Sequence, residues 1–205
     1  MRIVCISDTH SKHSQLKIPD GDLLLHAGDA TGRGGREEIG AFNAWLGSLP
    51  HRHKVIISGN HDFGFERNPE ARSWITHAVY LQDEEVTIEG LRIYGSPWQP
   101  WFFNWAFNLK RGPELAAVWA KVPAGIDVLL THSPPLGVLD RLDTGEPVGC
   151  EELTKALTRI RPKLHVFGHI HEAYGMVERD GIVYVNASSC NLKYRPVNPP
   201  VVVDL

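Results

Sequence analysis

Short runs of apolar residues recur along the chain and alternate with stretches of helical period. Ten runs rich in Val, Ile and Leu predict β-strands, and several read as buried on both faces because polar residues do not alternate with the apolar ones. The predicted strands are residues 2–7, 22–26, 54–58, 78–81, 86–89, 91–95, 127–131, 164–167, 182–185 and 201–204.

Apolar residues at helical spacing predict three helices between these strands, within residues 42–49, 115–122 and 153–160. Pro113 after Gly112 is typical of a helix start, and Pro162 after Arg161 of a helix end. Strands and helices alternate at both ends of the chain, and consecutive strands separate the two regions. This order predicts a mixed α/β fold in which two sheets pack together with helices outside them.

The length of the chain limits the number of domains. With 205 residues, against about 150 for a typical domain, one domain over residues 1–205 is the better prediction. We find no repeat, linker or low-complexity segment. A hydrophobic content of 42% belongs to a globular protein and excludes a disordered or collagen-like chain.

The net charge and the cysteines of the chain indicate which binding partners and which cellular compartment to expect. The 21 basic and 24 acidic residues give a net charge of −3, so we expect neither nucleic acid nor an anionic membrane surface as the main partner. No apolar run approaches the roughly 18 residues of a membrane span, and Asp8 follows the first run too soon for a signal peptide. Cys5, Cys150 and Cys190 form no disulfide framework, which favours a reducing cytoplasm. No pattern specifies an oligomeric state.

Polar residues with metal-binding side chains follow five of the predicted strands. The motifs are Ser7-Asp8-Thr9-His10, Ala27-Gly28-Asp29, Gly59-Asn60-His61-Asp62, Thr131-His132-Ser133 and Gly168-His169-Ile170-His171. Loops at the carboxyl ends of strands form the ligand crevice of an α/β sheet, so we expect the five to converge. One such motif arises easily by chance on a surface, but five in succession indicate a shared metal site.

This ordered set of motifs resembles the calcineurin-like metallophosphoesterases, and the resemblance runs through nearly the whole chain. Further segments resemble the short brain-type metallophosphoesterase-domain proteins of animals and their microbial relatives. These segments are residues 95–107, 131–137, 163–168 and 186–200. Some of those animal proteins carry glycine at the first histidine of the GHxH element, whereas this chain has His169.

The resemblance implies a four-layer α/β/β/α sandwich with a site for two divalent transition-metal ions. By position, it implies that Asp8, His10 and His171 hold the first ion, that Asn60, His132 and His169 hold the second, and that Asp29 bridges both. Carboxylate, amide and imidazole ligands without thiolate favour Mn, with Fe, Zn, Co or Ni as alternatives.

The implied activity is hydrolysis of phosphodiesters or nucleotide-like phosphoesters, so a small phosphoester or nucleotide is the expected substrate. Two cations about 3.5 to 4 Å apart can share a hydroxide and clamp phosphate oxygens, so no protein nucleophile is required. The chain accordingly has neither a G-x-S-x-G elbow nor a G-x-x-x-x-G-K-[ST] loop. A non-catalytic metal-containing scaffold and a nucleotide-binding protein are the alternatives.

Several residues beside the ligands are candidates for substrate chemistry. The resemblance makes His61 a non-ligand imidazole that stabilises the phosphoryl group or protonates the leaving oxygen, with a structural histidine as the alternative. Arg33 occupies a phosphate-binding position of the family, with a solvated loop charge as the alternative. Gly32 replaces the aspartate that precedes this arginine in protein phosphatases. This departure argues against the protein phosphatase branch. His13 is a candidate for a substrate contact at the rim of the site.

Two further features allow more than one interpretation. His26 and His165 lie inside apolar strand runs, where a hydrogen-bonded core imidazole is expected. The stretch 98–107 is crowded with aromatic residues. These rings either stack on a nucleobase or cover a sheet edge or core.

Overall fold

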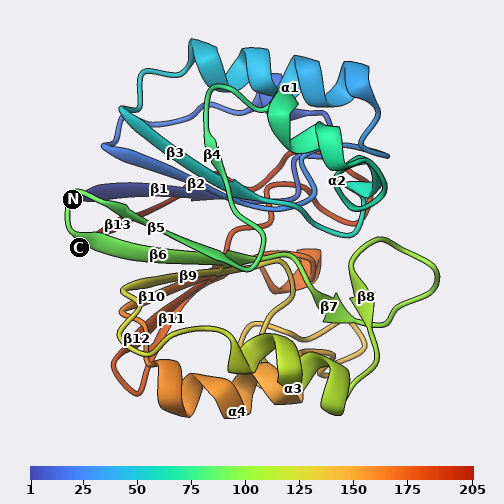
Figure 1. Cartoon of the computed structure of the whole chain (residues 1–205), viewed down its shortest axis with the longest axis vertical. Helices are drawn as coiled ribbons and strands as arrows, with labels where there is room; N and C mark the ends of the chain where they lie inside the picture. Colours follow the sequence, from blue (N-terminus) through green and yellow to red (C-terminus); the bar gives the residue numbers. More distant parts are fainter.

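Two β-sheets pack face to face between two layers of helices in the computed structural model, which describes residues 1–205 (Figure 1). In the first sheet only β13 runs antiparallel to its neighbour, and β1 to β4 are parallel. Its strands, in spatial order, are β13 (Val201–Asp204), β1 (Arg2–Ile6), β2 (Leu23–Ala27), β3 (His53–Ile57) and β4 (Val79–Tyr80).

The second sheet is also mixed, with antiparallel strands at its two edges and parallel strands between them. Its strands, in spatial order, are β11 (Gly175–Arg179), β12 (Ile182–Asn186), β10 (Leu164–Phe167), β9 (Val128–Thr131), β6 (Leu91–Ser96) and β5 (Glu84–Ile88). A separate pair, β7 (Gln99–Pro100) and β8 (Asn108–Leu109), projects beside this sheet (Figure 1).

Helices cover the outer face of each sheet. On the first sheet lie α1 (Arg36–Ser48) and α2 (Phe63–Arg67), and on the second lie α3 (Pro113–Ala120) and α4 (Glu151–Ile160) (Figure 1). Short 3₁₀ turns occur at η1 (His13–Gln15), η2 (Pro69–Trp74) and η3 (His171–Ala173). The result is the four-layer α/β/β/α sandwich of two mixed sheets that the sequence predicted.

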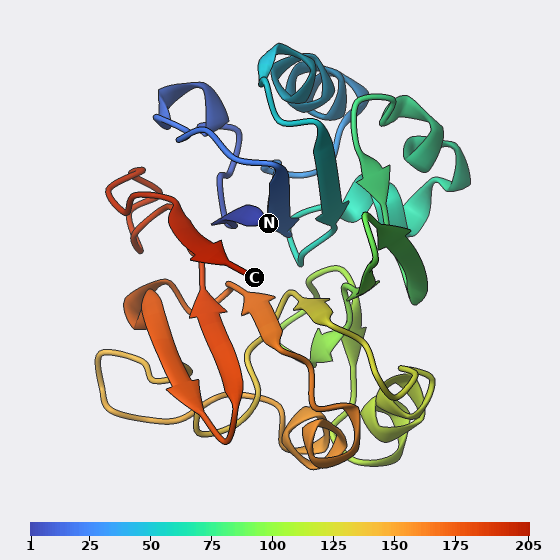
Figure 2. The same ribbon diagram turned by 90° about the vertical axis from the view of Figure 1, so that its left-hand side faces the viewer.

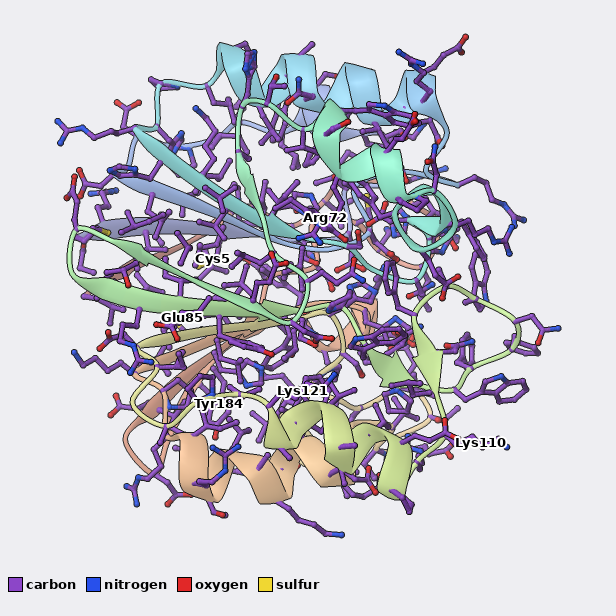
Figure 3. All side chains as sticks on the ribbon, in the orientation of Figure 1. Cys5, Arg72, Glu85, Lys110, Lys121 and Tyr184 are labelled. Carbon is purple, nitrogen blue, oxygen red and sulfur yellow. The ribbon has the colours of Figure 1, made fainter.

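Three apolar layers hold the four structural layers together, and β1 shows how one strand contributes to two of them. Ile3 and Cys5 belong to the cluster between the sheets, and Figure 3 shows Cys5 in this position. Val4 and Ile6 belong to the cluster under α1. Because both faces of the strand are buried, its sequence is continuously apolar rather than alternating.

Each of the ten predicted strands is present, with ends shifted by no more than two residues, and so is each of the three predicted helices. The pattern of apolar residues did not predict β7, β8, β11 or α2. Strand β11 is an edge strand with mostly exposed side chains, so its sequence lacks the apolar run that marks the others. Strands β7 and β8 have two residues each, too few for a period.

The two chain termini lie side by side at one end of the molecule, where the N–H of Leu205 donates to the carbonyl of Met1 at 3.0 Å (Figure 2). The parallel strands run from this end to the opposite one (Figure 1). The loops that carry the five motifs therefore gather at the far end of both sheets. No helix has the length and apolar character that crossing a membrane requires.

Candidate metal centre

The two sheets are joined where their parallel strands end. Ser7, directly after β1, forms a bridge with Ser188, which follows β12, and the N–H of Ser189 donates to the carbonyl of Ser7 at 2.8 Å. On the second sheet the N–H of Gly168 donates to the carbonyl of His132 at 3.0 Å. These bonds bring the motifs of one sheet against those of the other.

Asp8 is fully buried at the centre of this junction. Its Oδ2 accepts hydrogen bonds from the N–H of His169 and the hydroxyl of Ser188, both at 3.0 Å. Its Oδ1 lies 3.2 Å from Nε2 of His171 and 4.0 Å from Nε2 of His10. The N–H of His169 also lies 3.2 Å from Oδ1, so backbone and hydroxyl donors fix the carboxylate while Oδ1 faces two imidazoles.

Asp29 lies between the remaining imidazoles. Its Oδ1 is 3.5 Å from Nε2 of His132. Its Oδ2 is 3.8 Å from Nε2 of His10 and 4.0 Å from Nε2 of His61. A carboxylate with histidines on both sides of it has the placement expected of a ligand shared by two cations.

His132 and Asn60 form the other half of the cluster. Nε2 of His132 lies 2.9 Å from Oδ1 of Asn60, and the rings of His132 and His169 are 5.0 Å apart between centroids. Nδ1 of His132 is 2.9 Å from the carbonyl of Ala27. Because a carbonyl only accepts, Nδ1 carries the proton and Nε2 faces the cluster. The carbonyl of Asn191, 3.1 Å from Nδ1 of His171, orients that ring in the same way.

Close backbone approach makes this geometry possible. A Cβ at Gly168 would lie 1.9 Å from Oδ2 of Asp8, and one at Gly59 would lie 2.3 Å from Oδ1 of Asp29. Four of the seven predicted ligands also have left-handed backbones, with φ of 52° at Asp8, 41° at His10, 55° at Asp29 and 69° at His169. Such conformations cost energy in non-glycine residues and cluster at functional sites.

The carboxylates and imidazoles depend on one another electrostatically. Burial favours the neutral form of Asp29, but the nearby charge of His132 outweighs it and holds the pKa of Asp29 well below its usual range. The converse holds for His132, where burial is outweighed by Asp29 and the pKa rises to about 9. Burial lowers the pKa of His10 to about 4 and that of His169 to about 3. Buried carboxylates beside neutral imidazoles such as those of His10 and His169 suit a divalent cation.

Three groups of side chains place their ligand atoms within 4.8 Å of one another. They are Asp8 with His10 and His171, Asp8 with Asp29 and His132, and His10 with Asp29 and His61. The donor set is oxygen and imidazole nitrogen without thiolate, so the residues fit divalent transition-metal ions. The third group contains His61, which the sequence analysis assigned to catalysis rather than to ligation.

A family model described as calcineurin-like phosphoesterase matches residues 1–173. The chain belongs to this family. Metallophosphoesterase domain-containing protein 1 of Homo sapiens is 47% identical over 230 residues, which cover 100% of this chain and 71% of that protein. UPF0046 protein T07D4.2 of Caenorhabditis elegans is 40% identical over 237 residues, with 100% and 60% covered. These similarities confirm the resemblance drawn from the motifs.

A solved structure of the same architecture is that of TT1561 from Thermus thermophilus. It superposes with a TM-score of 0.57 at 12% identity, covering 90% of this chain and 88% of that one. At this identity the likeness concerns the fold alone. It agrees with the four-layer sandwich of a calcineurin-like phosphoesterase.

In this calcineurin-like phosphoesterase a pocket of about 350 Å³ opens over the cluster. Asp29, Asn60, His61, His169 and His171 contribute to its floor. Its walls are largely apolar and come mainly from two segments, 100–105 and 192–194; the wall residues are Pro100, Trp101, Phe102, Trp105, Leu142, Val148, Leu192 and Tyr194. The residues of the aromatic stretch therefore have different places in the structure. Phe107 is buried in the core, while Trp101 and Phe102 are exposed beside the pocket.

His61 is enclosed by two of these aromatic residues. The Trp105 ring lies 4.3 Å from the His61 ring at an interplanar angle of 30°, and the Tyr194 ring lies 5.8 Å away, edge to face. Tyr194 also approaches the rings of His10 and His171, at 4.7 and 6.0 Å. Tyr194 was not among the predicted site residues, although it lies within residues 186–200, a segment of the family resemblance.

Asp62 lies behind the cluster and organises its loops. Its carboxylate accepts bonds from the N–H groups of Gly59, Ala30 and Thr31, and from the Thr31 hydroxyl at 2.6 Å. Burial and the neighbouring Asp29 raise the pKa of Asp62 to about 6. The side chain supports two ligand loops and does not line the pocket.

Two predicted substrate contacts lie away from the pocket. His13 is buried against α1, with ring centroids 5.5 Å from Phe42 and 5.0 Å from Trp45. Arg33 is exposed, and its guanidinium lies 5.5 Å from the ring centroids of both Phe63 and Trp105. Neither residue lines the pocket, so the structure does not bring them to the predicted site.

The two strand histidines are core residues, as expected. Nε2 of His26 is 3.0 Å from the hydroxyl of Thr9, and Nε2 of His165 is 2.8 Å from the hydroxyl of Thr131. Both side chains are fully buried.

Ser188 supports the predicted ligand Asp8, and the motifs did not reveal this role. Its hydrogen bond to Asp8 joins segments 180 residues apart in the sequence.

Proposed function

We propose that this protein is a metal-dependent hydrolase of phosphodiesters or nucleotide-like phosphoesters, with a site for two divalent transition-metal ions. The observation that carries the proposal is the placement of the Asp29 carboxylate, which lies within 4.0 Å of imidazole nitrogens of His10, His61 and His132. Membership of the calcineurin-like phosphoesterase family supports the same reaction.

The chain offers one set of residues for each ion. Asp8, His10 and His171 would hold the first, Asn60, His132 and His169 the second, and Asp29 would serve both. When bound, such ions polarise phosphoryl oxygens and generate a nucleophile at neutral pH. Mn²⁺ is the first choice for this donor set, with Fe, Zn, Co and Ni as alternatives.

The pocket residues supply the rest of the chemistry. His61 presents Nε2 to the cluster, 4.0 Å from Asp29 Oδ2. In its doubly protonated form the ring can give the Nε2 proton to the departing oxygen as a general acid. Trp105 and Tyr194 enclose this imidazole and reduce its contact with bulk water. The apolar wall beyond them receives the leaving group, and a nucleobase can stack there because every base offers a π-face.

The charge of the pocket favours diesters over monoesters. Arg111 is the only Lys or Arg side chain among the lining residues. It is already engaged, because its guanidinium donates to the carbonyls of Val148 and Gly149 and pairs with Glu151. A phosphodiester carries one negative charge and a monoester up to two, so a pocket whose walls add no free Lys or Arg to the proposed metal ions suits the diester.

The test is hydrolysis of bis(p-nitrophenyl) phosphate by the purified chain with Mn²⁺ added. We expect turnover that is abolished by a chelator and restored by metal. No activity across Mn, Co, Ni, Fe and Zn, with a related phosphodiesterase active in the same assay, would overturn the proposal in favour of a scaffold. Mass spectrometry of the denatured protein separates the enzyme from a nucleotide-binding protein, which would release a tightly held nucleoside monophosphate.

We propose that the whole chain acts as one domain, because a single apolar cluster joins Ile3 and Leu25 of the first sheet to Val128 and Val166 of the second. The three cysteines are free and buried. Free thiols support a reducing compartment such as the cytoplasm.

A further inference from the structure

The orientation of the His61 ring is set by a backbone carbonyl. Nδ1 of His61 lies 3.2 Å from the carbonyl oxygen of Gly32. A carbonyl oxygen only accepts hydrogen bonds, so Nδ1 carries the proton in this contact. Nε2 is then the ring atom that faces Asp29 and the pocket.

The same peptide unit is held from its other side by a carboxylate. The amide N–H of this unit is that of Arg33, and it donates to Oε2 of Glu38 at 3.0 Å. The N–H of Gly32 donates to Oε1 of Glu38 at 2.9 Å, and the N–H of Gly35 donates to Oε2 at 3.2 Å. A continuous chain of hydrogen bonds therefore runs from the Glu38 carboxylate through one peptide to the His61 imidazole.

A negative charge at the N–H end of a peptide strengthens its carbonyl as an acceptor. Hydrogen bonds in series polarise one another, and a bond to an ionised group is stronger than one between neutral groups. Partial burial of Glu38 opposes ionisation, but the N–H groups of Gly32, Arg33 and Gly35 outweigh it and lower its pKa. The carboxylate is therefore charged at neutral pH.

We propose that Glu38 is a positioning residue for His61, acting through the Gly32–Arg33 peptide. It fixes the Nδ1-protonated ring so that Nε2 points at the site of reaction. Gly32 has no side chain that could orient His61 directly, and its carbonyl performs this task. The inference rests on the proposed function, in which the doubly protonated His61 ring donates its Nε2 proton to the leaving oxygen and keeps the Nδ1 proton bonded to Gly32.

A purely structural role of Glu38 is the competing explanation. Glu38 is the third residue of α1, and its bond to the N–H of Gly35 is a helix-capping interaction. Capping alone would stabilise α1 without affecting His61. However, the bonds to Gly32 and Arg33 lie outside the helix, and the Gly32 carbonyl is the hydrogen-bond partner of the His61 ring. The test must separate these two roles.

The first experiment compares leaving groups. The full chain, its Glu38→Gln variant and a Glu37→Gln control are loaded with Mn²⁺ and assayed on aryl methyl phosphates whose leaving groups range from p-nitrophenol to phenol. A general acid contributes roughly 10² to 10⁴ in rate, so we expect Glu38→Gln to lose about 10-fold more kcat on phenol than on p-nitrophenol. Glu37, also in the first turn of α1, should show no such dependence.

A second variant disturbs the same contact without changing any charge. A Cβ at Gly32 would lie 2.9 Å from Oε1 of Glu38, so Gly32→Ala displaces the carboxylate. We expect the same dependence on the leaving group as in Glu38→Gln. Glu38→Gln added to His61→Ala should cause no further selective loss, because the two residues act as one unit.

The third measurement does not depend on turnover. Nitrogen NMR of the His61 ring distinguishes the two neutral tautomers, and we expect the Nδ1-protonated form in the wild type and a mixture in Glu38→Ala. An unchanged His61 tautomer in Glu38→Ala would overturn the inference. So would an equal loss on every leaving group, even with His61→Ala selective, and in that case the proposed function would stand. If the wild type hydrolysed nothing, the proposed function would fail and the tautomer would still decide the role of Glu38.

Discussion

Asp29 contacts His61 through both of its carboxylate oxygens. The backbone N–H of His61 donates to Oδ1 at 2.8 Å, and Nε2 of the ring lies 4.0 Å from Oδ2. Asp29 follows β2 and His61 follows the neighbouring parallel strand β3. The distance between the predicted bridging ligand and the predicted proton donor is therefore fixed by the backbone of adjacent strands. This rigidity is what a positioned acid requires.

Replacing Asp29 by asparagine tests its proposed position between two cations. Asp29→Asn removes a negative charge from the middle of the cluster, so we expect a lower metal content together with a lower rate. Elemental analysis after dialysis measures the content directly.

The matched control is Asp127→Asn. Asp127 precedes β9 at the opposite end of the sheet, where it pairs with Lys163 at 2.9 Å, and its replacement should leave metal content unchanged. Two tightly held ions in Asp29→Asn would show that Asp29 does not bridge.

The sequence was sufficient for the architecture because the strands are buried on both faces. In β2, Leu23 and Leu25 face the second sheet and Leu24 faces α1, which produces the continuous apolar run. The five motifs end such strands, and the rule that loops at carboxyl ends converge was enough to gather them. The structure brings all seven predicted ligands to one end of the sandwich.

What the sequence did not indicate depends on contacts between distant segments. Ser188 and Tyr194 lie in polar loop sequence, and only the folded chain places them beside Asp8 and His10. The His61 ring donates to the backbone carbonyl of Gly32. Every residue type has such a carbonyl, so the residue type at position 32 gave no signal. His13 was expected at the rim because it follows the first motif closely. Its ring instead packs against α1, because the chain turns away from the pocket after His10.

Two glycines with opposite surroundings give a paired prediction. Gly168→Ala would place a Cβ 1.9 Å from Oδ2 of Asp8, so we expect destabilisation by about 1 to 3 kcal/mol and a loss of metal. Gly40 lies inside α1 with no atom within 4 Å of its Cβ position, so Gly40→Ala should stabilise the protein by about 1 kcal/mol. Urea unfolding measures both changes. Equal effects of the two substitutions would show that the close approach at Gly168 is unimportant.

The burial of His165 predicts that the free energy of unfolding falls in acid. Burial lowers the pKa of His165 to about 3, against about 6.5 in an unfolded chain. Between these values the unfolded state binds the extra proton, so stability is complete above pH 6.5 and declines as the pH falls towards 3. We expect His165→Gln to reduce this decline by up to about 1.4 kcal/mol per pH unit.

The measurement is the free energy of unfolding in urea, from pH 7 to 4, with a chelator present so that metal release does not contribute. His77→Gln is the control, since His77 is exposed and its replacement should leave the slope unchanged. An identical slope in His165→Gln and the wild type would mean that the pKa of this imidazole does not differ between the folded and unfolded states.

His61 is the residue at which ligation, general acid catalysis and charge stabilisation predict different results. If it is a general acid, His61→Asn should keep both ions and slow turnover by roughly 10² to 10⁴. If it is a metal ligand together with His10 and Asp29, the variant should instead lose metal. His53→Asn is the control, because His53 begins β3 at the end of this strand opposite to the loop that carries His61.

The dependence on the leaving group then separates the two catalytic roles. Departing p-nitrophenolate needs little protonation, whereas an alkoxide from a nucleoside needs much, so the loss of an acid should grow with the basicity of the leaving oxygen. If His61 only stabilises phosphoryl charge, its loss should lower the rate by a similar factor on both substrates, because that charge differs less between them than the basicity of the leaving oxygen. The comparison uses kcat/KM at saturating metal, since a hidden metal defect would imitate a chemical one. Near-wild-type turnover of His61→Asn on the poor leaving group would remove His61 from catalysis and leave proton delivery to another residue or to water.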